Sequence, residues 1–407
     1  MTIHNKSSID VIGITRCTGC FGCESACALG AIEMVLDDDG FYKPIVDHKK
    51  CSECGICQRY CPVLMKQKHM ICDEKKVEPK AFAAWTNDEQ VRMSSSSGGV
   101  FSELAKIVIK SGGMVAGCVW GEKWSPMHIL TDHWPDVERM RGSKYLQSNV
   151  GKIYQKVLDV LRETDKQVLF SGTPCQIAAM KEALSPEQRE RVLLVDFICH
   201  GVPSLRVFHR YLEDLFDGED VASYTFRDKS FGWKTTVLAV SSNGKRHHLP
   251  APSDPFFQGF AVHHLYVMEA CYQCQFARIP RFGDITLGDF WGCPEKWYDK
   301  RGVSVVLANT NAGYDAVECL HKSMAVDLKS VELSVAIAKN KRASLGDTYR
   351  IPKKRKRFLK SLKKGDDFKL LKRRYFPKKI HLFMRSLLSS GSKSRFISLF
   401  ILRRLGL

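Results

Sequence analysis

The sequence contains no run of eighteen apolar residues, so it predicts no ordinary transmembrane helix. The first residues, MTIHNKSSIDVIG, lack the charged segment and the following apolar segment of a secretory signal. The composition shows neither the bias of a disordered chain nor a fibrous repeat. We therefore expect a folded cytoplasmic protein, and 407 residues are enough for two or three domains.

Acidic side chains are almost missing from the last part of the chain. Between residues 351 and 407 there are nineteen Lys and Arg but only two acids, Asp366 and Asp367. This segment therefore holds +17 of the formal net charge of +18, and the preceding residues are about neutral. The basic character belongs to a tail and not to the body of the protein.

Cysteine, in contrast, is abundant, with sixteen in the chain. In a compartment that keeps thiols reduced, metal or redox chemistry explains them better than disulfides do. Eight of the cysteines form two runs with the spacing C-x2-C-x2-C-x3-C. The first run is Cys17, Cys20, Cys23 and Cys27, and the second is Cys51, Cys54, Cys57 and Cys61, followed by Pro62.

Residues 1–72, which hold these runs, resemble a bacterial-type ferredoxin domain, a small α+β unit with two [4Fe–4S] clusters. In such a run the first three thiolates bind one cluster and the fourth binds the other. We therefore predict one cluster on Cys17, Cys20, Cys23 and Cys61, and a second on Cys51, Cys54, Cys57 and Cys27. A structural zinc site is the alternative, but zinc takes four ligands and does not explain two complete runs.

From Lys80 onward predicted strands alternate with predicted helices, and we expect an α/β body with a parallel or mixed sheet. The segments QVLFSG and RVLLVDFIC are apolar runs bounded by turn residues, as in buried parallel strands. The segment KTTVLAVSSNGKRHHL predicts a hairpin with Asn243 and Gly244 as a two-residue turn. We divide the chain beyond the linker into residues 80–160, residues 161–340 and a tail, residues 341–407.

Four further cysteines predict a third [4Fe–4S] cluster. Cys175 lies in the first turn of a predicted helix, where the helix dipole favours a thiolate. Cys199 ends a predicted strand, so both thiols would meet at one rim of the sheet. Cys271 and Cys274 form a CxxC pair that can take two corners of a cube, with Cys293 as the reserve ligand. In the alternative, Cys175 and Cys199 are buried apolar residues, and the CxxC pair binds no cluster.

Several motifs of the body resemble the beta-subunit family of coenzyme F420 hydrogenases and dehydrogenases over roughly residues 80–310. The motifs are GTPCQIAAM, ICHGVPS, FRDKSFGW, the CxxC pair and RFGDITLGDFWG. The resemblance implies FAD and iron–sulfur clusters, with two-electron exchange at the flavin and single electrons passing through the clusters. Some relatives act on other substrates, and bacterial ones are often associated with surface polysaccharide synthesis. The fold and the cofactors therefore transfer more safely than the substrate does.

Two segments are predicted to hold the flavin. The first is a Ser/Gly loop before a helix, where hydroxyls and backbone amides suit a pyrophosphate and near which the family has its flavin. It consists of Ser94, Ser95, Ser96, Ser97, Gly98 and Gly99. The second, RGSKYLQS, is similar to a flavin-contacting segment and contains Lys144 and Gln147, of which Lys144 would neutralise phosphate or stabilise reduced flavin. The alternatives are an ordinary Ser-rich helix cap and a solvated lysine.

The remaining candidates for chemistry have no companions at a spacing that indicates a site. We expect the histidines to be structural or solvent-facing, and these are His200, His247, His248, His263 and His264. We expect Cys72, Cys118 and Cys319 to be small buried apolar side chains.

The sequence thus predicts an iron–sulfur flavoprotein oxidoreductase, like the F420 family, that couples hydride chemistry at FAD to one-electron transfer through [4Fe–4S] clusters. It identifies neither the substrate nor a catalytic residue. Two alternatives stay open: an electron-relay subunit without its own substrate, and a bacterial reductase of surface polysaccharide biosynthesis that does not use F420. The expected partner is a redox protein, either a ferredoxin or a partner subunit, and no nucleic acid is expected.

Two apolar stripes with helical spacing run through the basic tail. They consist of Ile380, Phe383, Met384, Leu387 and Leu388, and of Ile397, Phe400, Ile401 and Leu405. A basic amphipathic helix commonly lies on acidic lipid, so we predict that the tail acts at an anionic membrane surface, on the inner face of the membrane. The alternative is a helix packed on the body with its basic face in solvent.

Overall fold

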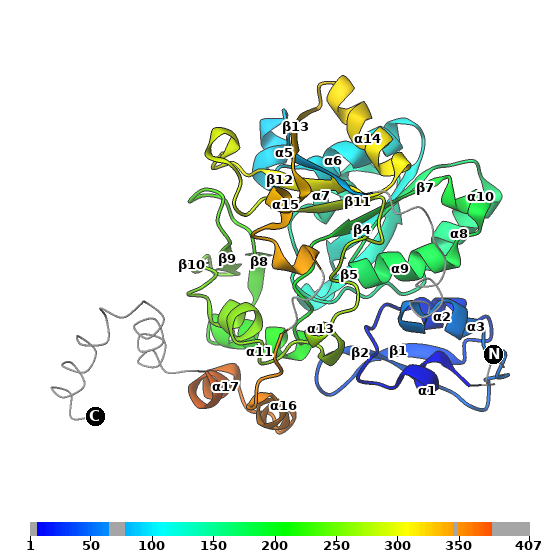
Figure 1. Ribbon diagram of the computed structural model, residues 1–407. Coiled ribbons are helices and arrows are strands. Elements are labelled where there is room, and N and C mark those ends of the chain that lie inside the picture. Colours follow the sequence, from blue (N-terminus) through cyan, green and yellow to red (C-terminus); the bar gives the residue numbers. More distant parts are fainter. Residues whose placement is uncertain (1–5, 65–77, 345–348, 377–407) are drawn as a thin grey trace.

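The computed structural model describes residues 6–64, 78–344 and 349–376 (Figure 1). The N-terminal unit, residues 6–64, has a two-stranded antiparallel sheet and short helices. These are β1 (Ile32–Leu36) with β2 (Tyr42–Val46), and α1 (Ser8–Ile12), α2 (Gly22–Ala26) and α3 (Ile56–Arg59). Helices α2 and α3 each begin inside a cysteine run, after a residue in the left-handed region: Phe21 (φ +70°) and Gly55 (φ +69°). The two runs therefore share one local fold.

The body is built on an eight-stranded sheet. In spatial order its strands are β13 (Val326–Val331), β3 (Lys80–Thr86), β12 (Ser304–Ala308), β11 (Ile285–Asp289), β7 (Val192–Phe197), β6 (Val168–Ser171), β4 (Met114–Trp120) and β5 (Pro126–Thr131). The pairs β4–β6, β6–β7 and β7–β11 are parallel, and the other pairs are antiparallel. The predicted α/β body is confirmed, with a mixed sheet, and the two apolar runs are the neighbouring strands β6 and β7.

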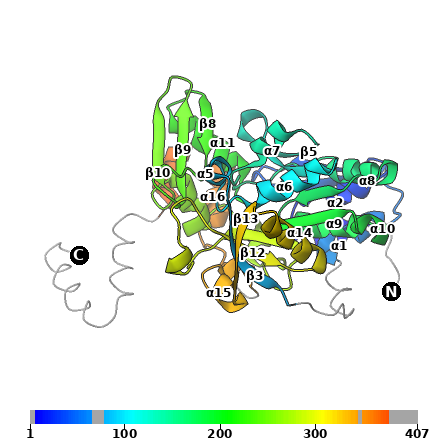
Figure 2. The same ribbon diagram turned by 90° about the horizontal axis from the view of Figure 1, so that it is seen from above.

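Helices cover both faces of this sheet (Figures 1 and 2). One face carries α6 (Val100–Lys110), α7 (Trp134–Met140) and α14 (Asn311–Lys322). The other face carries α8 (Ile153–Glu163), α9 (Pro174–Ala183) and α15 (Leu333–Ile337). The alternation of a strand divides its side chains between the two cores, since Phe82 and Ala84 of β3 belong to the first core, and Ala81 and Ala83 to the second.

A second, three-stranded antiparallel sheet stands beside the large one (Figure 2). It consists of β8 (Val221–Thr225), β9 (Thr236–Ser241) and β10 (Arg246–Pro250), and it packs with α11 (Leu205–Leu215) around aromatic side chains. The predicted hairpin is β9–β10, but its loop is longer than two residues, because the Ser241 N–H donates to the Lys245 carbonyl (2.9 Å). Gly244 has φ +83°, as a three-residue hairpin loop requires.

Short helical segments connect these elements. They are α5 (Glu89–Ser94), α10 (Pro186–Arg189), α12 (Pro255–Phe257), α13 (Glu269–Tyr272), a π-helix (Gln258–Val262) and the 3-10 turns Glu122–Trp124, Glu295–Trp297 and Lys341–Ala343.

The described part of the basic tail folds back on the body below α11 (Figure 1). It forms α16 (Arg355–Lys363) and α17 (Phe368–Tyr375), and Phe358, Leu362 and Leu371 are buried in the core that contains α11. Up to Phe376 the tail is therefore packed on the body, with most of its Lys and Arg side chains exposed. The two apolar stripes lie outside the described residues. Among those described, no helix is both long and apolar enough to cross a membrane.

Candidate functional site

Four cysteines that are far apart in the sequence line one cavity of the body. Cys175 lies in the first turn of α9, and Cys199 lies two residues beyond β7. Cys271 belongs to α13, and Cys274 follows in the next loop. All four line the same cavity, because β6 and β7 are adjacent and parallel and therefore end at one rim of the sheet. Cys293 lies elsewhere, against a separate apolar core.

Local structure positions these thiols. Thr173 caps α9, and its N–H donates to the side chain of Gln176 (2.9 Å) in a capping box. The Gly201 N–H donates to the sulfur of Cys199 (3.4 Å). Gly201 has φ +97°, and a Cβ atom there would lie 3.1 Å from the Cβ of Cys271. A glycine therefore permits both the backbone conformation and the close approach of two of the four cysteines.

The electrostatics of this cavity keep the thiols protonated as long as no metal is bound. Burial raises the pKa of the Cys175, Cys199 and Cys271 thiols, and neighbouring thiols raise it further. Arg342 and Arg281 also line the cavity and act in the opposite direction on the pKa of Cys199. A bound metal removes the proton from a coordinating thiol, so iron would have to displace these protons, and its positive charge together with the two arginines would balance the resulting thiolates. Four thiols with two arginines fit a [4Fe–4S] cluster.

A second group of cysteines lines a cavity of the N-terminal unit. Its members are Cys17, Cys20, Cys23 and Cys61. This is the grouping expected when each run lends its fourth cysteine to the other cluster. Desolvation raises the pKa of Cys61 to about 11.

The remaining N-terminal cysteines range from buried, at Cys57, to exposed, at Cys54. Cys57 accepts a hydrogen bond from the Ser8 N–H (3.2 Å), and the thiols of Cys54 and Cys51 are close enough to raise its pKa. Cys54 is exposed. Within the described ranges no three His, Cys, Asp or Glu side chains converge closely enough to hold a single metal ion. A four-iron cube spreads its thiolates further apart than a single ion does.

A larger cavity, of about 510 Å³, adjoins the four-cysteine cavity. The two cavities share five lining residues, which are Thr173, Gln176, Cys199, Gly201 and Val202. The volume is in the usual range for small-molecule sites, about 300–1,000 Å³. A ligand in the larger cavity would therefore lie directly beside the four cysteines.

Five of the eight predicted flavin-binding residues line this larger cavity: Ser95, Ser96, Ser97, Gly99 and Lys144. Ser94 and Gly98 do not, and a Cβ atom on Gly98 would lie 2.3 Å from the Ala84 carbonyl oxygen. Gln147 lines the four-cysteine cavity instead. Two hydroxyls of the loop are used within the protein, since Ser95 donates to the Val91 carbonyl of α5 (2.7 Å) and Ser97 to the Val303 carbonyl (2.9 Å).

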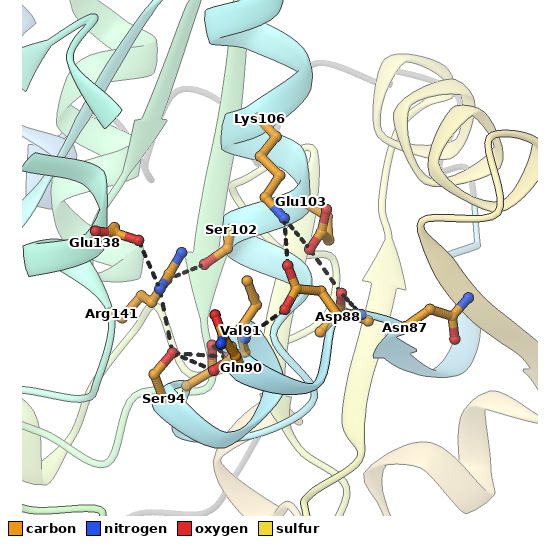
Figure 3. A network of polar contacts seen from close by, with 12 residues as sticks. Asn87, Asp88, Gln90, Val91, Ser94, Ser102, Glu103, Lys106, Glu138 and Arg141 are labelled. Carbon is orange, nitrogen blue, oxygen red and sulfur yellow. Dashed lines mark hydrogen bonds and ion pairs between the residues drawn. The ribbon is translucent and has the colours of Figure 1, made fainter. Parts of the chain in front are cut away.

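The start of α6 is the part of this site best suited to an anion. Its N-cap residue, Gly99 (φ +84°), has no side chain, and Val100 and Phe101 line the cavity. Arg141 lies beside it, with Nε donating to the Ser102 hydroxyl (3.1 Å) and Nη1 to the Ser94 hydroxyl (3.4 Å) (Figure 3). Arg141 also pairs with Glu138 (3.4 Å). The backbone N–H groups and the dipole of the helix start thus border the same part of the cavity as this guanidinium, and such a combination suits a phosphate.

Lys144 has a more constrained role than a solvated lysine. Its ammonium lies within 2.9–3.2 Å of the carbonyl oxygens of Arg139, Met140, Arg141 and Gly142, at the end of α7. Burial lowers the pKa of Lys144 to about 8. The side chain thus closes the C-terminal end of a helix, where a cation is favourable, while lining the cavity.

Comparison with known proteins identifies the family. Residues 81–155 match the N-terminal model, and residues 165–333 the C-terminal model, of the coenzyme F420 hydrogenase/dehydrogenase beta subunit. The chain belongs to this family. Residues 16–65 match the 4Fe–4S dicluster domain, so this family member is an iron–sulfur protein.

Two relatives illustrate the family. A subunit of the F(420)H(2) dehydrogenase of Methanosarcina mazei is 24% identical over 302 residues, covering 71% of this chain and 79% of that protein. A chain of the F420-reducing [NiFe] hydrogenase complex from Methanosarcina barkeri is 18% identical, with a TM-score of 0.46 over 69% of this chain and 99% of that one.

Two family motifs meet behind the Ser/Gly loop, which sequence reasoning did not foresee. Arg227 of FRDKSFGW donates to the carboxylate of Asp289 (2.9 Å), in LGDFWG, and to the Ser96 carbonyl (2.9 Å). Lys229 donates to the Ser97 carbonyl (2.7 Å), and burial lowers its pKa to about 7. The charged residues inside the two motifs could have indicated this contact. Arg227 and Asp289 are 62 residues apart in the chain, however, so the sequence did not show that they pair.

The isolated cysteines were expected to be small buried apolar side chains, and this expectation is wrong for Cys319. Cys118 faces His128 across the β4–β5 pair, and both line the larger cavity. Cys319 is exposed and not buried, and Cys72 lies outside the described residues. A strand pattern predicts which face a side chain takes but not what covers that face.

His128 should make the stability of this family member sensitive to acid. Burial lowers its pKa to about 4, and Nδ1 has no hydrogen-bond partner among the described residues. Below pH 6.5 the unfolded chain takes up a proton that the folded chain does not, so the free energy of unfolding falls as the pH falls. We expect a loss of about 2 kcal/mol between pH 8 and pH 5 from this group. Anaerobic denaturant titration of wild type and His128→Gln measures it, and identical pH profiles would exclude the effect.

Proposed function

We propose that this protein is a flavin- and iron–sulfur-dependent oxidoreductase. The observation that supports the proposal is the shared wall between the larger cavity and the four-cysteine cavity. A flavin in the first would lie beside a cluster in the second, and the N-terminal unit adjoins that cluster through Thr18 and Gly19. FAD, when bound, would exchange a hydride with a substrate and single electrons with the clusters.

The residues of the chain have separate tasks in this proposal. The backbone N–H groups at the start of α6 and the guanidinium of Arg141 would bind the pyrophosphate. Arg227 and Lys229 hold the carbonyls of Ser96 and Ser97 behind the loop and so keep its backbone in place. Cys175, Cys199, Cys271 and Cys274 would hold the third cluster, and the eight N-terminal cysteines the other two.

We expect one non-covalent FAD per chain, because the contacts proposed for it are hydrogen bonds and ion pairs. Acid precipitation of anaerobically purified protein should release a flavin with an AMP moiety. Arg141→Leu should weaken FAD binding by about 10- to 150-fold, since a hydrogen bond to a charged group contributes about 1.5–3 kcal/mol. Arg162→Leu, an exposed arginine paired with Asp159, is the matched control. If the reconstituted protein binds no flavin, the proposal of an enzyme is wrong, and an electron-relay subunit without its own substrate takes its place.

The substrate and the partners are also proposals. The curated relative is named as an F(420)H(2) dehydrogenase subunit, so coenzyme F420 is the first substrate to assay, followed by NAD(P)H and ferredoxin. We propose a redox partner subunit or a ferredoxin as the electron partner, and a cytoplasmic location. The stretch beyond Phe376 is proposed to contact an anionic membrane surface.

A further inference from the structure

Gln147 joins the body to the N-terminal unit. It is 5% exposed, and its amide nitrogen donates to the carbonyl oxygens of Thr18 (3.0 Å) and Gly19 (2.8 Å). Its amide oxygen accepts from the N–H of Tyr42 (3.2 Å). Both N–H groups and the oxygen of this side chain are therefore used on the N-terminal unit.

The contact lies between two predicted clusters. Thr18 and Gly19 separate Cys17 from Cys20, which are predicted ligands of the first cluster. The same two residues and Gln147 line the four-cysteine cavity. Gly19 has φ +61°, and a Cβ atom there would lie 2.3 Å from the amide nitrogen of Gln147. The loop therefore approaches the cavity as closely as it does only because it has no side chain at this position.

A second buried side chain fastens the same loop. The Tyr154 hydroxyl donates to the Cys20 carbonyl (2.8 Å) and lies 3.2 Å from the carbonyl of Gln176, the residue after Cys175. Tyr154 is 1% exposed and stacks on Phe170. Cys175 and Cys274 also pack against the apolar core that contains Cys17 and Cys61. Two predicted clusters thus approach each other at this loop.

The two N-terminal clusters face different surroundings. Cys17 and Cys61 of the first set are buried and share an apolar core with Ala178 of α9. Cys54 of the second set is exposed, and the neighbouring Ile56 is 42% exposed. The first set therefore faces the body, whereas the second set reaches solvent at Cys54, although its Cys57 is buried.

We propose that Gln147 is a positioning residue, supported by Tyr154, that holds the first cluster against the third and directs electrons through the Cys17–Cys20 loop. The second cluster is then the exit toward the redox partner. The inference rests on the proposed function, since it requires the third cluster. Each transfer oxidises one cluster by one electron and reduces the next by one, and no bond forms or breaks. Tunnelling falls steeply with distance, so a loosened contact slows transfer without removing iron.

The test compares three variants of the full chain, purified anaerobically: Gln147→Leu, Tyr154→Phe and the control Gln155→Leu, whose amide bonds Asp159 within α8. EPR of the dithionite-reduced protein reports the magnetic coupling between the third and first clusters, and freeze-quench after flavin photoreduction reports the transfer rate. We expect Gln147→Leu to keep its iron, lose coupling and slow transfer at least tenfold. Tyr154→Phe should change both in the same direction by less, and Gln155→Leu should change neither.

Coupling and rate equal to wild type in an iron-replete Gln147→Leu would overturn the inference. If that variant loses iron, Tyr154→Phe decides in the same way, because it removes a single oxygen atom. A different failure concerns the unaltered protein. If the wild-type protein contains only about eight iron atoms per chain, it has no third cluster. The proposed function would then be wrong, whatever the variants show.

Discussion

Replacing Cys175 by serine is expected to lower the iron content from about twelve to about eight atoms per chain, because the third of three four-iron clusters loses a ligand. The N-terminal clusters should stay visible by EPR, since no cysteine of the two runs is touched. The flavin should still accept a hydride, but electrons should no longer reach the N-terminal unit. Anaerobic iron analysis with EPR and single-turnover spectroscopy measures all three effects.

Cys118→Ser is the matched control for this variant. Cys118 is half-buried like Cys175 but lines only the larger cavity, so its loss should leave the iron content unchanged. Unchanged iron together with unchanged onward transfer in Cys175→Ser would take Cys175 out of the site. Our location of the third cluster would then be wrong.

Removing the carboxylate of Asp196 is expected to lower the free energy of unfolding by about 3–5 kcal/mol, because it leaves a buried arginine without its counter-charge. Asp196 and Arg281 have fully buried side chains and lie 3.1 Å apart. Asp196 also accepts a hydrogen bond from the Gly283 N–H (3.2 Å), so its loss leaves that donor unsatisfied as well. Anaerobic denaturant titration of Asp196→Ala, followed by circular dichroism, gives the change.

Two further variants isolate the cause. Asp327→Ala breaks an ion pair with Lys329 in which both side chains are more than 40% exposed, and its effect should stay within about 0.5 kcal/mol. The double variant Asp196→Ala/Arg281→Met removes the buried charge together with its partner and should recover much of the loss. A double variant no more stable than Asp196→Ala would contradict an electrostatic origin.

The fold of the body was predictable where it depends on short stretches of sequence. Strands β6 and β7 follow from two apolar runs bounded by turn residues, and they pair as neighbours. Cys175 lies in the first turn of α9, as predicted, because the cap Thr173 and the helix-compatible Pro174 act within one turn. The hairpin turn was misjudged by one residue, since Asn-Gly suits a two-residue loop as well as the observed longer one.

The candidate site was predictable only in part. Neighbouring parallel strands bring Cys175 and Cys199 to one rim, and this follows from the order of elements along the chain. The role of Gln147 did not follow, because its partners Thr18 and Gly19 are 129 and 128 residues away. His128 gave no signal either, since its burial and low pKa depend on the residues that cover β5.

The sequence by itself determined the chemistry of this protein: two cysteine runs, a CxxC pair, two further thiols at strand and helix ends, and the motifs of the family. These features are local, because ligand spacing and helix caps act over a few residues. The tertiary structure alone decided which thiols share a cavity, that Arg227 meets Asp289, and that the tail packs as far as Phe376. Such contacts depend on the order of strands in the sheet and on what covers each face, and no short stretch of sequence encodes either.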